Sequence, residues 1–420
     1  MPAAAKKNIP IPPVPLPKQH PLPNGNTLYY FENSALELLK LDITVEAGSS
    51  YQGCKCQAHA ANQLFGEATR LRDAREVAEF IDFRGIVVER MTDAYTGSIS
   101  FYFLRRYAEE LFPLLREMFD CPLVTQTMFE AYAAKRRQQL AVGLKKTGYV
   151  ARNRFYELIF GPGHPLGTYA TPDAVGGLAL DAVCGFIRDR YRLDHAHIVL
   201  SGKVDSGVLA LAGRWLSPDR RPAPAPAPIL PPEPCAERQS YCPMADAVQS
   251  TIRIGRLLPY AWDSADYARF MVLSTALGGY FGSRLMSSIR EEKGYTYGIY
   301  SQTQIYRDGI LFYIVADVAA ESAQAAVGEV FAEMRRLQDE PLSDGELERV
   351  CNFMAGDFIR SIDGVFELSE RCRQMAATGV TELLSANLAA AIRTVSPAQL
   401  QALARHAFAG LCTVVAGPDL

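Results

Sequence analysis

The chain has 420 residues, of which 49% are hydrophobic and 21% charged, and its net charge is -3. This composition is typical of a globular protein with enough apolar residues for two or more cores. The near-neutral charge gives no electrostatic indication of nucleic-acid binding or of attraction to an anionic membrane. Nine cysteines, an odd number spread from Cys54 to Cys412, favour reduced core residues over a disulfide framework.

The N-terminal segment combines Lys6 and Lys7 with a proline-rich stretch over residues 9–17. Repeated prolines cannot form the helical core of a signal peptide. We therefore predict that residues 1–22 form an extended arm and that the protein is cytoplasmic. No run of about 20 apolar residues occurs in the chain, so no membrane span is expected.

The first half of the chain shows alternating helix and strand patterns. Asp73 followed by Glu76 is a capping signal for a helix that ends at Gly85. In chain order we predict helix 73–82, strands 86–91 and 98–104, helix 107–119, a helix from about residue 126, helix 181–191 and strand 197–202.

The second half repeats this order. Asp308-Gly309 is a hairpin signal, and Ser343 and Ser396 begin capping boxes. An Asp-x-Pro-Leu sequence separates two long helices in both halves, at 120–123 and at 339–342. We predict helix 283–292, strands 295–303 and 310–316, helix 322–338, a long helix after residue 343, helix 397–408 and strand 413–417. The repeated order indicates a tandem duplication of one α+β domain.

A proline-rich segment over residues 218–234 separates the halves and favours a stiff polyproline spacer. It gives an N-terminal domain over 23–217 and a C-terminal domain over 235–420. The expected fold class is α+β, and each domain should contain a mainly antiparallel sheet covered by helices on one face.

Four segments resemble a known family. They are residues 24–28 together with 42–49, residues 156–167, residues 277–285 (LGGYFGSRL) and residues 289–297 (IREEKGYTY). From about residue 22 onward the chain resembles the pitrilysin/insulinase family of inverted-zincin peptidases. Within that family it is similar to the branch with mitochondrial processing peptidase and small bacterial two-chain relatives. The resemblance implies that the two domains assemble into a half-shell.

The zinc signature of that family is H-x-x-E-H on a helix, in which two His bind zinc and Glu activates water. Alignment on the following Leu-Phe places Ala58 and Asn62 at the two His positions and Ala61 at the Glu position. The family's third ligand would fall near residues 135–137, Lys-Arg-Arg, which repel a cation. We therefore expect no cofactor in this chain, and zinc in a partner.

A second part of the family's site is present. Arg290 and Tyr297 lie seven residues apart with Gly294 between them, a spacing that in the family places a guanidinium and a phenol near the scissile bond. Both groups can donate hydrogen bonds to a peptide carbonyl or to a developing oxyanion. In bacterial relatives this pair and the zinc signature can lie on different chains. The simpler interpretation is a helix-end charge and a half-buried strand tyrosine.

The resemblance implies a non-catalytic, substrate-binding subunit of a heterodimeric zinc metalloendopeptidase. Its partners would be a homologous zinc-bearing subunit and a peptide or unfolded protein. A structural or assembly protein and a peptide-binding homodimer of the same fold are alternatives.

Three local patterns favour packing over ligand binding. The Cys-x-Cys-x-x-His sequence at 54–59 lacks a fourth zinc ligand. The glycines at 278–282 lack the Lys-Ser/Thr of a phosphate loop, and fit a tight turn between helices. His-x-His at 195–197 fits a strand edge.

Overall fold

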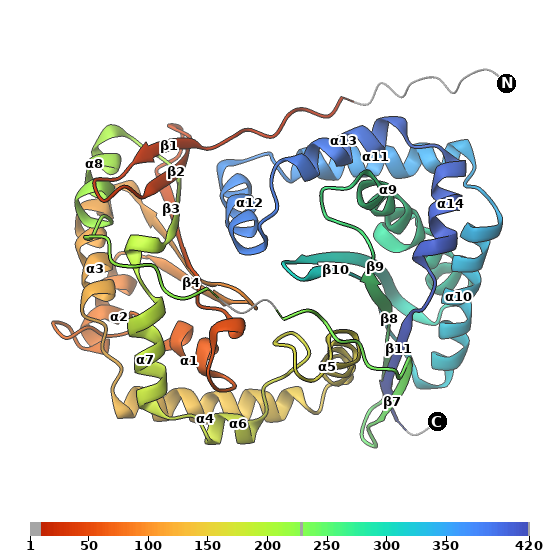
Figure 1. Cartoon of the computed structure of the whole chain (residues 1–420), viewed down its shortest axis with the longest axis horizontal. Helices are drawn as coiled ribbons and strands as arrows, with labels where there is room; N and C mark the ends of the chain where they lie inside the picture. The colour runs from red at the N-terminus through yellow and green to blue at the C-terminus, as the bar shows by residue number, and fades with distance from the viewer. Residues whose placement is uncertain (1–9, 227–229, 419–420) are drawn as a thin grey trace.

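The computed structural model describes residues 10–226 and 230–418 and contains two lobes, each built on one β-sheet (Figure 1). The first sheet has the strand order β1-β2-β6-β3-β5-β4, and the second has the order β7-β11-β8-β10-β9. We call them the first and second lobe. The strands are β1 (Lys18–Pro21), β2 (Thr27–Glu32), β3 (Leu38–Val45), β4 (Val87–Thr92), β5 (Gly97–Leu104), β6 (His197–Gly202), β7 (Gln239–Pro243), β8 (Gln249–Leu258), β9 (Thr296–Tyr306), β10 (Gly309–Ala319) and β11 (Cys412–Gly417).

The two sheets share one topology once β1 is set aside. In each sheet, the strand that comes first in the sequence pairs in parallel with the strand that comes last. These pairs are β2 with β6 and β7 with β11. The remaining pairs are antiparallel. The predicted α+β class with two mainly antiparallel sheets is confirmed, and the repeated order follows the internal repeat in the sequence.

The helices begin and end close to their local sequence signals. Asp73 with Glu76 and Ser396 with Gln399 form the predicted capping boxes, and the Ser343 side chain accepts one backbone N–H. The helices are α1 (Gln57–Leu64), α2 (Ala74–Phe83), α3 (Ala108–Asp120), α4 (Gln126–Gly143), α5 (Thr147–Phe160), α6 (Pro172–Gly176), α7 (Leu180–Arg190), α8 (Ser206–Trp215), α9 (Ala265–Ser274), α10 (Ala323–Asp339), α11 (Asp344–Arg360), α12 (Val365–Thr378), α13 (Leu383–Thr394) and α14 (Pro397–Ala407).

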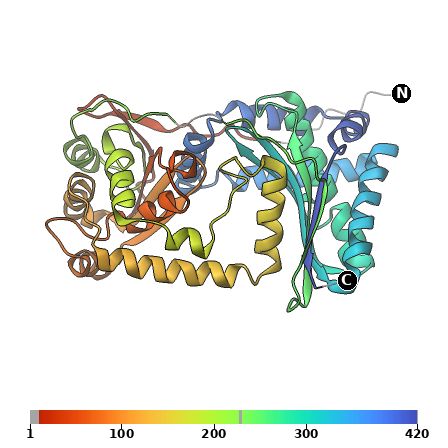
Figure 2. The same cartoon turned by 60° about the horizontal axis from the view of Figure 1, so that its bottom comes forward.

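Two helices are exchanged between the lobes, so the expectation of helices on one face of each sheet is incomplete. Helix α5 comes from the first half of the sequence but packs on β8 and β11 of the second sheet (Figure 2). There Phe155 and Phe160 are fully buried with Cys412 and Val414. In return, α12 from the second half packs on β2, β3 and β6 of the first sheet. Each sheet is therefore covered by helices on both faces. One face of each sheet is covered by a helix from the other half of the sequence.

The face of β3 under α12 is polar. The Asp42 side chain is 1% exposed and lies 3.1 Å from the Lys40 ammonium group, which is also buried. Ser100 of β5 and Ser369 of α12 both donate to the Asp42 carboxylate. Glu370 of α12 lies 4.0 Å from Lys40. A buried ionic network therefore holds α12 on the first sheet, whereas α5 packs on the second sheet through apolar contacts.

The hairpin between β9 and β10 reaches from the second lobe into the first. Its turn residues are Arg307 and Asp308, one position earlier than the Asp308-Gly309 pair of the sequence signal, and Gly309 opens β10 with φ 146°. The Asp308 carboxylate accepts a hydrogen bond from the Tyr95 hydroxyl and lies 3.5 Å from Nε2 of His164. The backbone N–H of residue 166 donates to Nδ1 of His164 at 3.1 Å, so in the neutral ring Nε2 carries the proton toward Asp308.

Asp308→Asn is expected to lower the free energy of unfolding by about 1–3 kcal/mol, because it removes the charge that two first-lobe donors stabilise. Burial opposes the charged form, but the hydrogen bonds from His164 and Tyr95 hold the pKa of Asp308 below its ordinary 3.8. A carboxylate whose pKa is lower in the folded than in the unfolded protein stabilises the folded protein at pH values above its unfolded-state pKa. The difference between wild type and variant in urea unfolding should therefore be constant near neutral pH and shrink as the pH falls below 3.8. Asp246→Asn, in the exposed turn between β7 and β8, is the control; an equal loss there would contradict the assignment.

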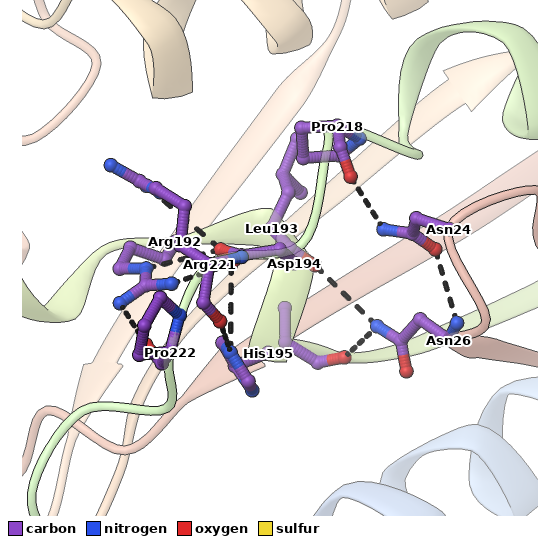
Figure 3. Close-up of polar contacts among 10 residues, drawn as sticks. Asn24, Asn26, Arg192, Leu193, Asp194, His195, Pro218, Arg221 and Pro222 are labelled. Carbon is purple, nitrogen blue, oxygen red and sulfur yellow. Dashed lines mark hydrogen bonds and ion pairs between the residues drawn. The ribbon is translucent and has the colours of Figure 1, made fainter.

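The first part of the proline-rich segment is fastened to the first lobe. Asn24 donates to the carbonyl of Pro218 at 2.9 Å (Figure 3). The buried carboxylate of Asp194 accepts hydrogen bonds from Arg192 and from the backbone N–H of Arg221 at 2.9 Å. Arg192 also donates to the carbonyl of Pro222 at 2.9 Å. These bonds fix where the chain leaves the first lobe, so this part of the segment is not a free spacer.

The described part of the N-terminal arm runs extended from the first lobe to the second. Residues 18–21 form β1 beside β2, and Ile11 is buried in the core of the second lobe. Arg393 of α13 donates to the carbonyl of Ile11 at 3.0 Å. The arm therefore bridges both lobes. Within 10–226 and 230–418, no single helix could span a membrane by length and hydropathy; the bent pair α12 and α13 meets those criteria only jointly.

Candidate functional site

Helix α1 carries the three positions that the alignment assigned to the zinc signature. Ala58, Ala61 and Asn62 are all 1% exposed or less. The Asn62 amide donates to the carbonyl of Ser98 at 3.3 Å. Cys56 caps the helix with a φ of 70°, the one described non-glycine residue with positive φ. This helix end is therefore packed and hydrogen-bonded as part of the first lobe's core.

His59 lies on the same helix but is held by a neighbour. Its Nδ1 lies 2.8 Å from the Tyr132 hydroxyl of α4. Burial, with the nearby Arg136 guanidinium, lowers the pKa of His59 to about 4, so the ring is neutral at pH 7. Cys54 is exposed while Cys56 is buried. Among the described residues, no group of three or more His, Cys, Asp or Glu side chains could hold a metal ion.

The residues at the family's zinc positions do not fit zinc. Two of them end in methyl groups, which have no lone pair, and the Asn62 amide is bonded to the backbone. At the predicted place of the third ligand, Arg136 lines the same cavity as Ala58 and His59. A guanidinium there repels a divalent cation, so the charge of this site is reversed relative to a metal centre.

Arg290 and Tyr297 lie together in a groove of about 790 Å³ at the other end of the second sheet. The Tyr297 side chain is 94% exposed. Arg290 belongs to a π-helix over Met286–Glu292, and its guanidinium lies 4.6 Å from the ring centre of Phe281. It forms no ion pair with any residue in the described parts of the chain. Tyr297 therefore faces solvent, and Arg290 is partly exposed, with the Phe281 ring against its guanidinium.

A β-bulge explains the exposure of Tyr297. The residue lies two positions before the buried Ile299, so strict alternation would turn it toward the core. The register with β10 shifts here, so that Tyr297 and Gly298 stand opposite Asp317 alone. The Thr296 hydroxyl donates to the Asp317 carbonyl at 2.6 Å and accepts from the Gly298 N–H at 3.1 Å. Bulges re-aim side chains in this way and are frequent next to active sites.

The structure does not bring the Arg/Tyr pair to the chain's own degenerate zinc positions. Tyr297 is near the start of β9, whereas Tyr306 at its end lines the cavity beside Ala58. Nine residues of extended strand separate these two points by about 30 Å. The Arg/Tyr pair is therefore remote from the degenerate zinc positions of its own chain.

The other two sequence patterns are structural. Gly278 lies so close to β9 that an added Cβ would meet the backbone nitrogen of Ser301 at 2.8 Å, which explains a glycine in this helix turn. His195 contacts the carbonyl of Arg221 in the linker at 2.8 Å. His197 stacks on Tyr29 with ring centres 5.0 Å apart. The two histidines therefore bind different neighbours.

Sequence reasoning missed several residues around the cavity beside α1. Arg152 and Asn153 come from the exchanged helix α5, and Arg253 comes from β8 of the second sheet. A polar run at 152–154 inside an otherwise packed helix was the one available signal. Their convergence depends on the helix exchange, which no local pattern reveals.

Comparison with known proteins finds relatives that share this fold. Residues 177–354 match the family described as the peptidase M16 inactive domain. The crystal structure of a peptidase M16 inactive domain from Pseudomonas fluorescens superposes with a TM-score of 0.84 at 20% identity, over 96% of this chain and 98% of that one.

Two curated bacterial relatives are also similar in sequence. An uncharacterized zinc protease of Streptomyces coelicolor is 23% identical, over 83% of this chain and 77% of that protein. The non-peptidase homolog YmxG of Helicobacter pylori is 25% identical, over 64% of this chain and 63% of that protein. Together these matches show a peptidase M16 inactive domain over residues 177–354 and the fold of M16 peptidases for the chain as a whole.

Proposed function

We propose that this chain is the non-catalytic, substrate-binding subunit of a two-chain zinc endopeptidase, in the branch of the family resembling mitochondrial processing peptidase. A homologous partner would carry H-x-x-E-H and the zinc ion. This chain would supply Arg290 and Tyr297 to the partner's active site and hold an unfolded peptide there.

The exposed Arg/Tyr groove carries this proposal. A phenol that is 94% exposed and a guanidinium without an ion pair to described residues contribute little to the stability of this chain. Their chemistry suits a peptide carbonyl, where both groups can donate hydrogen bonds. The name of the Helicobacter relative, a non-peptidase homolog, supports a member without peptidase activity of its own.

The test is peptidase activity on an unfolded peptide with added zinc, measured for this chain, for a zinc-bearing homologue from the same genome, and for their mixture. We expect the mixture to be active and this chain alone to be inactive. A chelator should abolish the activity of the mixture. Chelator-sensitive activity in this chain alone would contradict the proposal and direct attention to Cys54, Cys56 and His59.

A structural or assembly protein of the same fold is the second candidate. It predicts a stable complex with a homologue but no activity in the mixture. The exposed Tyr297 and the absence of an ion pair between Arg290 and any described residue favour the peptidase subunit, because a purely structural role requires neither feature.

A further inference from the structure

A cavity of about 570 Å³ lies between the two lobes, beside the degenerate zinc positions. Helices α1 and α4 of the first lobe, the exchanged helix α5, and strands β8, β9 and β10 of the second lobe contribute to its wall. Its volume is within the range of sites that hold small organic ligands. It is separate from the Arg290/Tyr297 groove, with which it shares no lining residue.

The charge of this cavity is strongly positive. Lys55, Arg136, Arg152 and Arg253 line it, and Asp93 is the one acidic residue among the lining residues. The Asp93 carboxylate is already used: one oxygen accepts two backbone N–H groups at 2.6 Å each, and the other accepts a hydroxyl at 2.7 Å. No described residue forms an ion pair with any of the four cations. Four cations against one carboxylate give the cavity a net positive charge.

Three buried N–H donors on this wall have no hydrogen-bond partner among the described residues. They are Nε of Arg136, Nε of Arg253 and Nδ2 of Asn153. Asn153 is only 7% exposed. Buried polar groups are nearly always hydrogen-bonded, and leaving a donor unpaired is costly. A guanidinium can only donate, so the missing partner must be an acceptor, and the positive charge favours an anion.

The rest of the lining selects the kind of anion. Tyr149, Tyr156, Tyr306 and Tyr313 face the cavity and supply flat apolar surface as well as hydroxyl groups. The volume is far larger than an inorganic anion needs. A carboxylate carried on an organic body matches both the donors and the aromatic wall.

We propose that this cavity binds a carboxylate of a peptide, at the chain end or on an acidic side chain, through Arg136, Arg253 and Asn153. The site replaces the metal of the family with fixed cations, and it would select acidic peptides. That the ligand is a peptide rests on the proposed function; that it is an anion does not.

The test uses the isolated full-length chain and three forms of one short fluorescent peptide: free carboxyl terminus without acidic residues, carboxyl-terminal amide, and amide with one internal glutamate. Fluorescence anisotropy reports binding. We expect at least one charged form to bind about tenfold or more tightly than the neutral amide, with affinity falling as salt rises. Whichever charged form binds identifies the source of the carboxylate.

The double variant Arg136→Gln with Arg253→Gln should bind the charged peptides no more tightly than the neutral amide. Arg335→Gln, on the exposed face of α10 away from the cavity, is the matched control and should change nothing. Asn153→Asp is the second variant, because it keeps the side-chain volume and replaces a donor with a negative charge. Circular dichroism melts check that each variant is folded.

Equal binding of the three peptides, or an unchanged preference in the folded arginine or Asn153 variants, would overturn the proposal. Inorganic phosphate that binds with the same dependence on the arginines, while no peptide binds, would also overturn it. Because the partner is absent from this assay, its failure would leave the activity test of the mixture unaffected.

Discussion

Tyr297→Phe is expected to lower the turnover number of the reconstituted two-chain peptidase by about 10²–10³-fold, the loss seen when one oxyanion donor is removed. In the proposed two-chain site, the phenol would donate to the carbonyl oxygen of the substrate as negative charge develops on it. The effect should fall mainly on kcat, because the bond strengthens in the transition state. Steady-state kinetics of the mixture on one unfolded peptide measures both constants.

The control for this variant is Tyr300→Phe, on the same strand and 45% exposed but outside the groove. It should leave kcat within about twofold of wild type, since surface changes away from a site usually have little effect. Because Tyr297 is almost fully exposed, its loss should not change the melting temperature. If the mixture is active and its kcat is unchanged in Tyr297→Phe, the Tyr297 hydroxyl does not stabilise the transition state.

Asp42→Ala is expected to lower the free energy of unfolding by about 3–5 kcal/mol, the loss typical of breaking a buried ion pair. Lys40 would remain as a buried cation, and Glu370, 4.0 Å away, would be its one countercharge among the residues that the structure describes. The hydroxyls of Ser100 and Ser369 would lose their shared acceptor. Urea unfolding followed by circular dichroism measures the change.

Lys40→Met combined with Asp42→Ala separates the uncompensated charge from the lost packing. Removing both ions together is often close to neutral, so the double variant should recover more than half of the loss. Asp363→Ala, at an exposed turn before α12, is the control for a change of net charge. A double variant as unstable as Asp42→Ala would show that the cost comes from the hydroxyls and packing.

The order of helices and strands could be predicted because its signals are local. The Asp73–Glu76 and Ser396–Gln399 boxes fix helix starts through hydrogen bonds within one turn. The hairpin at Asp308 was found to within one residue, a small error because Gly309 also takes a positive φ. By contrast, no local signal shows that α5 packs on the second sheet and not on the first, because a helix needs an apolar stripe in either position.

The candidate site could be predicted in part. The family resemblance singled out Arg290 and Tyr297, and the structure places both in one groove, while their role in substrate binding stays a prediction. The exposure of Tyr297 could not be predicted, because it depends on a register shift between two strands. The resemblance put the third ligand position near residues 135–137, and Arg136 does line the cavity beside Ala58, but that cavity also includes Arg253 from the second sheet. These cavity residues come together through helix–sheet packing between segments that are distant in the sequence.

The exchange of α5 and α12 makes each half of this duplicated chain a structural complement of the other. A polypeptide containing one half alone would have a sheet with one face bare and a helix with no surface to bury, and two identical copies could satisfy each other by trading that helix. That is the geometry of a domain-swapped homodimer with twofold symmetry. Joining the two copies of such a dimer through one linker would give a chain with the same exchange of helices, and in this protein the proline-rich segment is that linker. Cutting that linker should therefore leave the two pieces associated.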